Sequence, residues 1–271
     1  MDPSLALFWG LYAVTGAVVG VLAGLLGVGG GLIIVPALTV LFEAQGFPSA
    51  VTLHLALGTS LSTILFTSIS STRAHHRHQA VDWSIVAKIT PGILLGTYLG
   101  GVAAARMHTP LLKGVFAVFL FLVAIQMISG ARPQPTRKLP STPATGAVGL
   151  LIGGVSGLVG IGGGSMSVPF MIWCNITVRR AIGTSAAIGF PIAAAGAASY
   201  IVNGMAAPTG VPHALGYVHL PALAGVALFS MLTAPLGARL TSTLDPARIK
   251  RAFAYLLLFM GVRMLWGIVT K

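Results

Sequence analysis

The chain is organised as long apolar runs separated by short polar stretches. A run of about 20 predominantly apolar residues is long enough to cross the hydrocarbon core of a bilayer as a helix. The pattern therefore predicts an all-α integral membrane protein that crosses the bilayer many times. The long runs lie near residues 5–26, 53–72, 85–105, 110–130, 143–164, 183–204, 220–240 and 249–269.

Two shorter apolar pieces, near residues 31–42 and 165–176, each follow a cluster of glycines. At about 1.5 Å per residue, a helix of this length covers only about half of the hydrocarbon thickness. We therefore expect short or broken helices here, with unwound backbone at the glycine-rich breaks.

The sequence also contains an internal repeat, in which three landmarks recur in the same order. Such an order indicates a duplicated unit rather than chance similarity in a glycine-rich chain. The landmarks are Gly24-Leu-Leu-Gly-Val-Gly-Gly-Gly31 with Pro36 and Gly157-Leu-Val-Gly-Ile-Gly-Gly-Gly164 with Pro169, then Leu57-Gly58-Thr59-Ser60 and Ile182-Gly183-Thr184-Ser185, and finally Lys113 with Phe116 and Lys250 with Phe253.

The repeat divides the chain into a first transmembrane repeat at 1–130, a polar linker at 131–143 and a second transmembrane repeat at 144–271. If each short piece crosses the membrane, each half has an odd number of crossings and the second half is inverted. Lys and Arg concentrate in cytoplasmic loops, and five crossings place most of the 16 Lys and Arg residues on the side of the linker. We predict two inverted repeats of about five segments each, a cytoplasmic linker and both termini outside. If the short pieces instead enter and return on one side, this charge bias weakens.

Composition supports the membrane assignment. Hydrophobic residues make up 55% of the 271 residues and charged residues only 7%, with a mean hydropathy of +0.92. A soluble domain carries about 25% charged residues, so a soluble fold is excluded. The net charge of +12 does not indicate nucleic-acid binding, because the basic residues lie at the ends of apolar runs. The single cysteine, Cys174, excludes an internal disulfide.

The two glycine clusters are the best candidates for a binding site. A helix that begins in a break presents free backbone N–H groups and a partial positive charge, which together favour an anion. If the halves are inverted, the two breaks meet near the middle of the membrane. The alternative is that the glycines serve only close helix packing. The candidate substrate-binding glycines are Gly29, Gly30 and Gly31 in the first half, and Gly162, Gly163 and Gly164 in the second.

Hydroxyl side chains near these clusters are further candidates, because they donate hydrogen bonds to an anion without adding charge. Ser165 follows the second cluster directly, whereas its counterpart Leu32 has no hydroxyl, so the two half-sites are predicted to be unequal. Serine and threonine in membrane helices also commonly bond only to their own backbone. The duplicated candidates are Thr59 and Ser60, and Thr184 and Ser185.

The four acidic residues all fall at span ends or in loops. Transporters of cations and proton relays usually keep an intramembrane carboxylate, so the pattern favours an anionic substrate. No catalytic set lies within the spans, and the histidines near residues 75–78 are flanked by arginines rather than by metal-binding partners. We therefore predict no enzyme activity, no metal and no cofactor.

The repeated Gly-Val/Ile-Gly-Gly-Gly followed by proline, with the repeated Gly-Thr-Ser, resembles the TauE/SafE family of sulfite and organosulfonate permeases from about residue 10 to 268. The resemblance implies a multi-pass permease of a bacterial inner membrane that handles sulfite, sulfoacetate or related anions. It assigns no binding residues, direction or coupling ion. We predict a secondary transporter that works by alternating access, with a small anion and membrane lipid as its partners. A small-anion channel is the alternative, and the choice of proton or sodium as coupling ion stays open.

Overall fold

The computed structural model describes residues 3–26, 30–130, 137–207, 209–240 and 246–269. In this part of the chain ten helices account for nearly all regular structure, and one two-residue hairpin joins β1 (Ala214–Leu215) to β2 (Val218–His219). The helices are α1 (Pro3–Leu26), α2 (Gly31–Ala44), α3 (Ser49–Arg77), α4 (Trp83–Arg106), α5 (Thr109–Ser129), α6 (Thr142–Val159), α7 (Gly164–Trp173), α8 (Val178–Ala206), α9 (Leu220–Leu240) and α10 (Pro246–Val269).

Five of these helices, α3, α4, α5, α6 and α8, are long and apolar enough to cross a membrane. The other expected long spans lie within α1, α9 and α10, and the two short apolar pieces form α2 and α7. The structure thus confirms the prediction of an all-α protein with many apolar helices, and it confirms short helices after the glycine-rich breaks.

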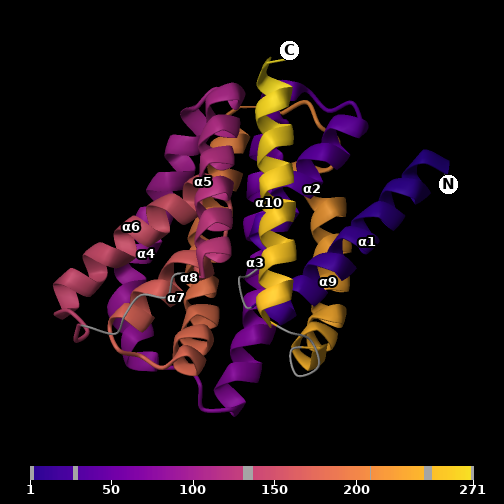
Figure 1. Cartoon of the computed structure of the whole chain (residues 1–271). Helices are drawn as coiled ribbons and strands as arrows, with labels where there is room; N and C mark the ends of the chain where they lie inside the picture. The colour runs from indigo at the N-terminus through magenta and orange to yellow at the C-terminus, as the bar shows by residue number, and fades with distance from the viewer. Residues whose placement is uncertain (1–2, 27–29, 131–136, 208, 241–245, 270–271) are drawn as a thin grey trace.

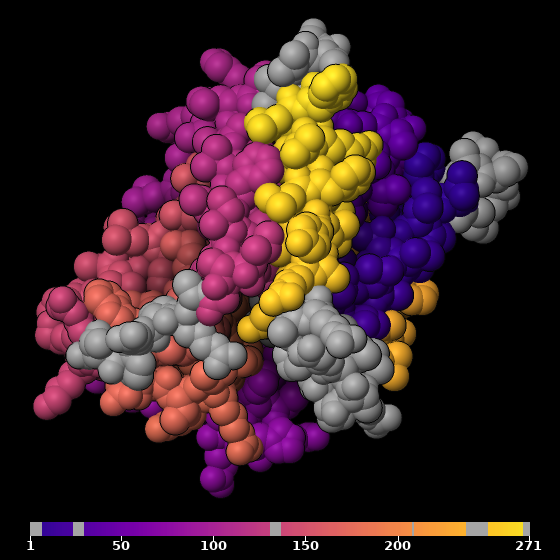
Figure 2. Space-filling view, viewed as in Figure 1, coloured from indigo at the N-terminus to yellow at the C-terminus, as the bar shows by residue number. Residues whose placement is uncertain are grey.

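The helices of the two halves pack mainly against each other rather than within their own half (Figure 1). Helix α1 lies along α9, and α4 lies along α6; α3 packs on α8, and α5 on α10. If α1–α5 correspond to α6–α10 in order, this set of contacts is unchanged when the halves are exchanged. In the space-filling view α10 lies between α5 on one side and α1 and α2 on the other (Figure 2).

Helices α3 and α8, which carry the two Gly-Thr-Ser motifs, run in opposite directions. The guanidinium of Arg179, at the start of α8, donates to the carbonyl of His78, just after α3, at 2.9 Å. Tyr200, close to the end of α8, packs against Gly58, in the first half of α3. This antiparallel arrangement is the one that two inverted repeats would produce.

Glycines allow the paired helices to approach closely. A methyl group added at Gly92 of α4 would collide with the backbone of Gly146 in α6, and one added at Gly153 of α6 would collide with the backbone of Ile93 in α4. Small residues at helix contacts of this kind are typical of membrane proteins, where close van der Waals packing drives association. The glycine content therefore serves both close packing and the helix breaks.

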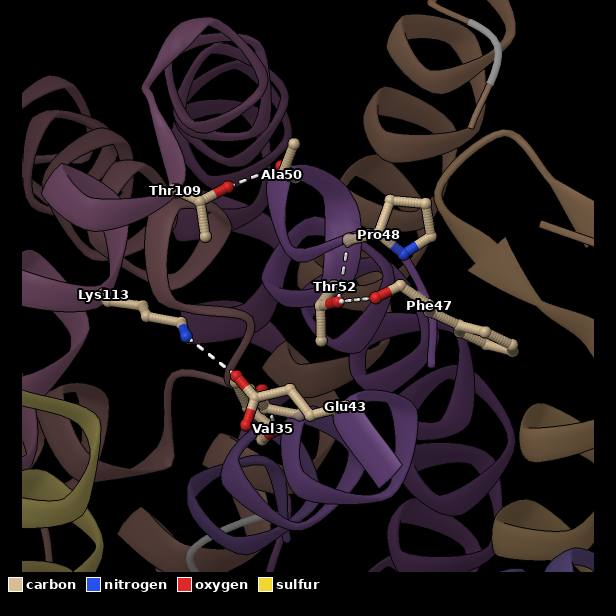
Figure 3. Close-up of polar contacts among 9 residues, drawn as sticks. Val35, Glu43, Phe47, Pro48, Ala50, Thr52, Thr109 and Lys113 are labelled. Atoms are coloured by element: carbon tan, nitrogen blue, oxygen red, sulfur yellow. Dashed lines mark hydrogen bonds and ion pairs between the residues drawn. The ribbon is translucent and has the colours of Figure 1, made fainter. Parts of the chain in front are cut away.

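Two ion pairs lie at helix ends in the described part of the chain. Lys113 of α5 is only 6% exposed, and its ammonium group lies 2.9 Å from a carboxylate oxygen of Glu43 on α2 (Figure 3). Arg180 of α8 pairs with Asp82, which precedes α4, at 3.1 Å. Glu43 lies 12 residues along α2 from Gly31, which is about 18 Å of helix. Its carboxylate is therefore far from the breaks.

Candidate functional site: two helix breaks in contact

The first break separates α1, which ends at Leu26, from α2, which begins at Gly31. Gly30 adopts a left-handed conformation with φ of 65°, which glycine accepts without the steric cost that a side chain brings. Its carbonyl accepts hydrogen bonds from the amides of Ile33 and Ile34 at 3.0 and 3.1 Å, so it forms the first turn of α2. Gly29, the remaining candidate of this cluster, lies outside the described residues.

The second break has the same construction. Gly160 ends α6 with φ of 67°, and Gly163 precedes α7 with φ of 73°. The carbonyl of Gly163 accepts from the amides of Met166 and Ser167 at 3.1 and 2.8 Å. The positions that the repeat aligns, Gly30 and Gly163, therefore have the same left-handed conformation and the same role at the start of a short helix.

The two breaks are in direct backbone contact. A methyl group added at Gly31 would lie 2.8 Å from the carbonyl oxygen of Gly160 and 3.0 Å from the Cα of Ile161. Gly162 is buried, and its carbonyl faces Gly189 on α8. The breaks thus bring two segments 130 residues apart together inside the bundle.

Backbone donors are available at the start of α7. The first N–H groups of any helix have no acceptor within it. The amides of Gly164 and Ser165 have no hydrogen-bond partner among the described residues. The partial positive charge of the helix N-terminus adds to these donors, so an anion is favoured there.

Two hydroxyl groups beside this helix end also lack partners. Ser156 of α6 is fully buried, and its Oγ lies 3.4 Å from the position that a Cβ on Gly163 would occupy. Within the described chain neither this Oγ nor the buried Oγ of Ser165 forms a hydrogen bond. A buried hydroxyl without a partner costs about 1–3 kcal/mol, so both groups are available to donate to an acceptor beside the start of α7.

The predicted serines of the Gly-Thr-Ser motifs lie next to the second break. The hydroxyl of Ser60 donates to the carbonyl of Gly160 at 2.8 Å. The hydroxyl of Ser185 shares a 2.8 Å hydrogen bond with that of Ser167, on the second turn of α7. Ser60, from the first half, therefore contacts the second break itself, and Ser185, from the second half, contacts the helix that follows it.

The threonines of the same motifs have a different environment. The Oγ1 of Thr59 accepts a 2.9 Å hydrogen bond from the amide of His219, the residue before α9. The Oγ1 of Thr184 accepts a 2.9 Å hydrogen bond from the amide of Asp82, the residue before α4. Each threonine therefore fixes the start of a helix that belongs to the other half.

The glycine that precedes each threonine completes this contact. A side chain at Gly58 would collide with the carbonyl of Tyr217, and one at Gly183 would collide with the carbonyl of Ala80. Each carbonyl lies two residues before the amide that the threonine binds. We call each such arrangement, in which the glycine and the threonine of one motif both contact the same segment, a Gly-Thr clamp.

Each clamped segment also caps the helix that follows it. Asp82 accepts from the amides of Ser84 and Ile85 through its carboxylate, and His219 accepts from the amide of Ala222 through Nδ1 at 3.3 Å. Burial lowers the pKa of His219 to about 4, so the ring stays neutral and Nδ1 keeps the lone pair that accepts.

Sequence reasoning missed two of these features. Ser156 was not a candidate, because its repeat counterpart is Ala23 and no duplication marks it. The clamp role of Thr59 and Thr184 was also missed. The glycine that precedes the threonine in both motifs is the available signal, since a glycine is needed where another backbone approaches closely.

The fold and the paired breaks define the class of protein: a multi-pass membrane transporter built from short helices and helix breaks that meet within the bundle. Comparison with known proteins supports this assignment. The profile of the family described as sulfite exporter TauE/SafE matches residues 12–264. The chain belongs to this family.

Curated relatives carry the same general description. A "Probable membrane transporter protein" of Haemophilus influenzae is 35% identical over 255 residues, covering 94% of this chain and 97% of the relative. A relative of the same description in Methanocaldococcus jannaschii is 30% identical over 260 residues, covering 94% of each chain. One from Bacillus subtilis is 29% identical over 214 residues, covering 72% of this chain and 78% of the relative. No solved structure matches the chain.

Proposed function

We propose that this protein carries small sulfur-containing anions, such as sulfite, sulfoacetate or related organosulfonates, by alternating access. The observation that carries the proposal is the unpartnered Oγ of Ser156 beside Gly163 at the N-terminus of α7. A sulfonate or sulfite group offers three acceptor oxygens. The hydroxyls of Ser156 and Ser165 and the amides of Gly164 and Ser165 are donors that lack acceptors in the described chain.

The charges around the breaks favour an anion over a cation. Glu43 and Asp82 are both engaged in ion pairs at helix ends, and the helix end at Gly164 carries a partial positive charge. A cation at this position would meet amide and hydroxyl hydrogens, and both carboxylates of the described residues are already paired with other cations. A monoanion gains charge-assisted hydrogen bonds, which are roughly twice as strong as neutral ones.

The other predicted residues enter the proposal with distinct roles. Gly30 and Gly31 bring α2 against the second break, and Ser60 and Ser185 hold the backbone and side chains of that break in place. Thr59 and Thr184 do not contact the anion in this proposal, because their hydroxyls hold the segments before α9 and α4.

Alternating access requires that the contact between the breaks opens. Gly31 and Gly160 lie against each other in this conformation, and in this proposal their separation admits an anion to the start of α7. We propose that separation toward one face and then toward the other moves the anion across the membrane, as in other carriers with paired broken helices.

Binding to the purified, full-length protein tests the proposal. Thermal stability is followed in detergent with sulfite, sulfoacetate, taurine, sulfate, chloride and a set of amines at constant ionic strength. A ligand that binds only the folded state stabilises it, by about 2.7 kcal/mol at 100 times Kd. We expect saturable stabilisation by sulfite or a sulfonate and none by amines. Stabilisation by amines alone would contradict an anion site.

Flux into proteoliposomes separates a carrier from a channel. A carrier shows saturating uptake and accelerated exchange when unlabelled substrate is present on the far side. Uptake that rises linearly with concentration and shows no counterflow would replace alternating access with a small-anion channel.

A further inference from the structure

A pocket of about 310 Å³ lies between the second half of α3 and the middle of α9, apart from the helix breaks. One wall carries two arginines and a serine, and the rest of the lining is apolar. The lining residues are Ile69, Ser70, Arg73, Ala74, Arg77 and Met231.

The two arginines have no acidic partner in the described part of the chain. The ion pairs there join Lys113 to Glu43 and Arg180 to Asp82. Asp82 is the acidic residue nearest to Arg77 in the sequence, and both of its carboxylate oxygens are engaged, one by Arg180 and the other by the first amides of α4. Arg73 and Arg77 thus present two positive charges to the pocket, and neither forms an ion pair with a carboxylate of the described residues.

The spacing of these arginines favours a shared ligand. They are four residues apart on α3, so their side chains leave the same face of the helix one turn apart. Like charges at this spacing repel each other by a few tenths of a kcal/mol, and a bound anion reverses that repulsion. The planar guanidinium group matches a tetrahedral or pyramidal oxyanion through paired N–H donors.

The remaining lining fits the other features of such a ligand. The hydroxyl of Ser70 forms no hydrogen bond with the described residues and supplies one more donor. Ile69, Ala74 and Met231 offer apolar contact for a short carbon chain. Ser60, which touches the second break, lies ten residues earlier on α3, or about 15 Å along the helix.

We propose that this pocket binds an oxyanion through the guanidinium groups of Arg73 and Arg77. A sulfonate or sulfite group and the phosphate of an acidic lipid headgroup share the chemistry that these groups recognise. When the small anion is the ligand, the pocket is a binding point that it occupies before it reaches the breaks. The binding itself does not depend on the transport proposal, because no residue of the pocket belongs to the breaks.

A cysteine placed in the pocket reports on the proposal directly. Cys174 is the single native cysteine, so Ser70→Cys in a Cys174→Ala background gives one reactive thiol. Its rate of modification is measured with 2-sulfonatoethyl methanethiosulfonate and with the trimethylammonium analogue, each divided by the rate with a free thiol. We expect the anionic reagent to be favoured by about tenfold, because a basic pocket concentrates anions.

Variants that remove the arginine charges test whether these charges cause the preference for the anionic reagent. Arg73→Gln with Arg77→Gln should reduce the preference for the anionic reagent to near unity. The matched control, Arg106→Gln with Arg263→Gln, removes two exposed arginines from α4 and α10 that do not line the pocket, and it should retain the preference. An equal preference in all three proteins would overturn the proposal. Ala74→Cys, at an exposed pocket position, repeats the test if the thiol at position 70 reacts too slowly to measure.

Protection by ligands distinguishes the two sources of oxyanion. Inorganic sulfate in lipid-free detergent is compared with chloride at equal ionic strength, so that screening is the same in both. Vesicles of phosphatidylcholine are compared with vesicles that also contain phosphatidylglycerol. Slower modification with sulfate identifies a small-anion site, and slower modification only with phosphatidylglycerol identifies a lipid-headgroup site. Protection by neither would refute oxyanion binding, and it would leave stabilisation by sulfonates at the breaks unaffected.

Discussion

The two helix breaks share a backbone but differ in chemistry. Gly30 and Gly163 have φ angles of 65° and 73° and stand in the same place before a short helix. The second break adds the hydroxyls of Ser156 and Ser165, whereas the aligned residues of the first break are Ala23 and Leu32. The two breaks thus share the left-handed glycine that precedes the short helix, while the buried hydroxyls without partners among the described residues lie at the second break. This difference favours a single anion site at the second break over two equivalent half-sites.

The largest expected effect comes from removing the left-handed glycine of the second break. Gly163→Val places a β-branched residue at φ of 73°, and its Cβ would collide with Ile192. Backbone strain and overpacking together should cost about 3 kcal/mol or more. Transport should fall while the protein still inserts, as measured by uptake into proteoliposomes and by membrane yield.

A variant of the first break and a control variant test whether the loss of transport is specific to the breaks. Gly30→Val should also reduce transport, because Gly30 has the same left-handed conformation and closely faces Val19. Gly114→Ala on α5 is the control, because a Cβ there meets no atom within 4 Å. Full uptake by both valine variants would remove the breaks from the transport mechanism.

The next largest effect concerns the unpartnered hydroxyls. Ser156→Ala combined with Ser165→Ala should weaken binding of the stabilising anion by about 100-fold or more, since each of the two lost hydrogen bonds to a charged group contributes about 1.5–3 kcal/mol. Without ligand, the Tm should stay constant or rise, because two buried hydroxyls without partners are removed. Isothermal titration calorimetry and a ligand-free thermal melt measure the two effects separately. A lower Tm with unchanged affinity would show that these serines serve packing alone.

A smaller loss of stability should follow when Lys113 is replaced, but not when Lys250, the lysine that the repeat aligns with it, is replaced. Lys113 is buried and paired with Glu43, whereas Lys250 is exposed. Lys113→Met leaves the Glu43 carboxylate without its partner, and because that side chain is one-third exposed the expected loss is about 1–2 kcal/mol, less than for a fully buried pair. Lys250→Met should leave the Tm unchanged. Equal melting temperatures for both variants would show that the ion pair in the first half adds no stability.

The smallest effects should come from the Gly-Thr clamps. Thr59→Val leaves the buried amide of His219 without its acceptor, at a cost of about 1 kcal/mol or more. Thr184→Val should cost less, because the amide of Asp82 is only partly buried and water can replace the lost acceptor. Denaturation of the two variants in parallel checks this order, and a larger loss for Thr184→Val would reverse it.

Much of the fold follows from the sequence because the responsible forces are local. The length of each apolar run predicts a helix, and a glycine cluster predicts where that helix breaks; α2 and α7 begin within a residue of the expected positions. The same glycine clusters predict the candidate glycines and Ser165. Ser156 does not, because a serine in an apolar helix usually bonds to its own backbone, and nothing in the sequence shows that this one has no partner.

The sequence by itself determined that the chain spans a membrane, that the same motifs recur in its two halves and that each recurrence contains a glycine-rich helix break. These properties depend on hydrophobic length and on the conformational freedom of glycine, which neighbouring residues set. The tertiary structure alone decided that the buried Oγ of Ser156 has no partner among the described residues, that Thr59 holds a segment 160 residues away, and that two arginines share a pocket with α9. Such features depend on which distant helices come into contact, and only the folded bundle fixes those contacts.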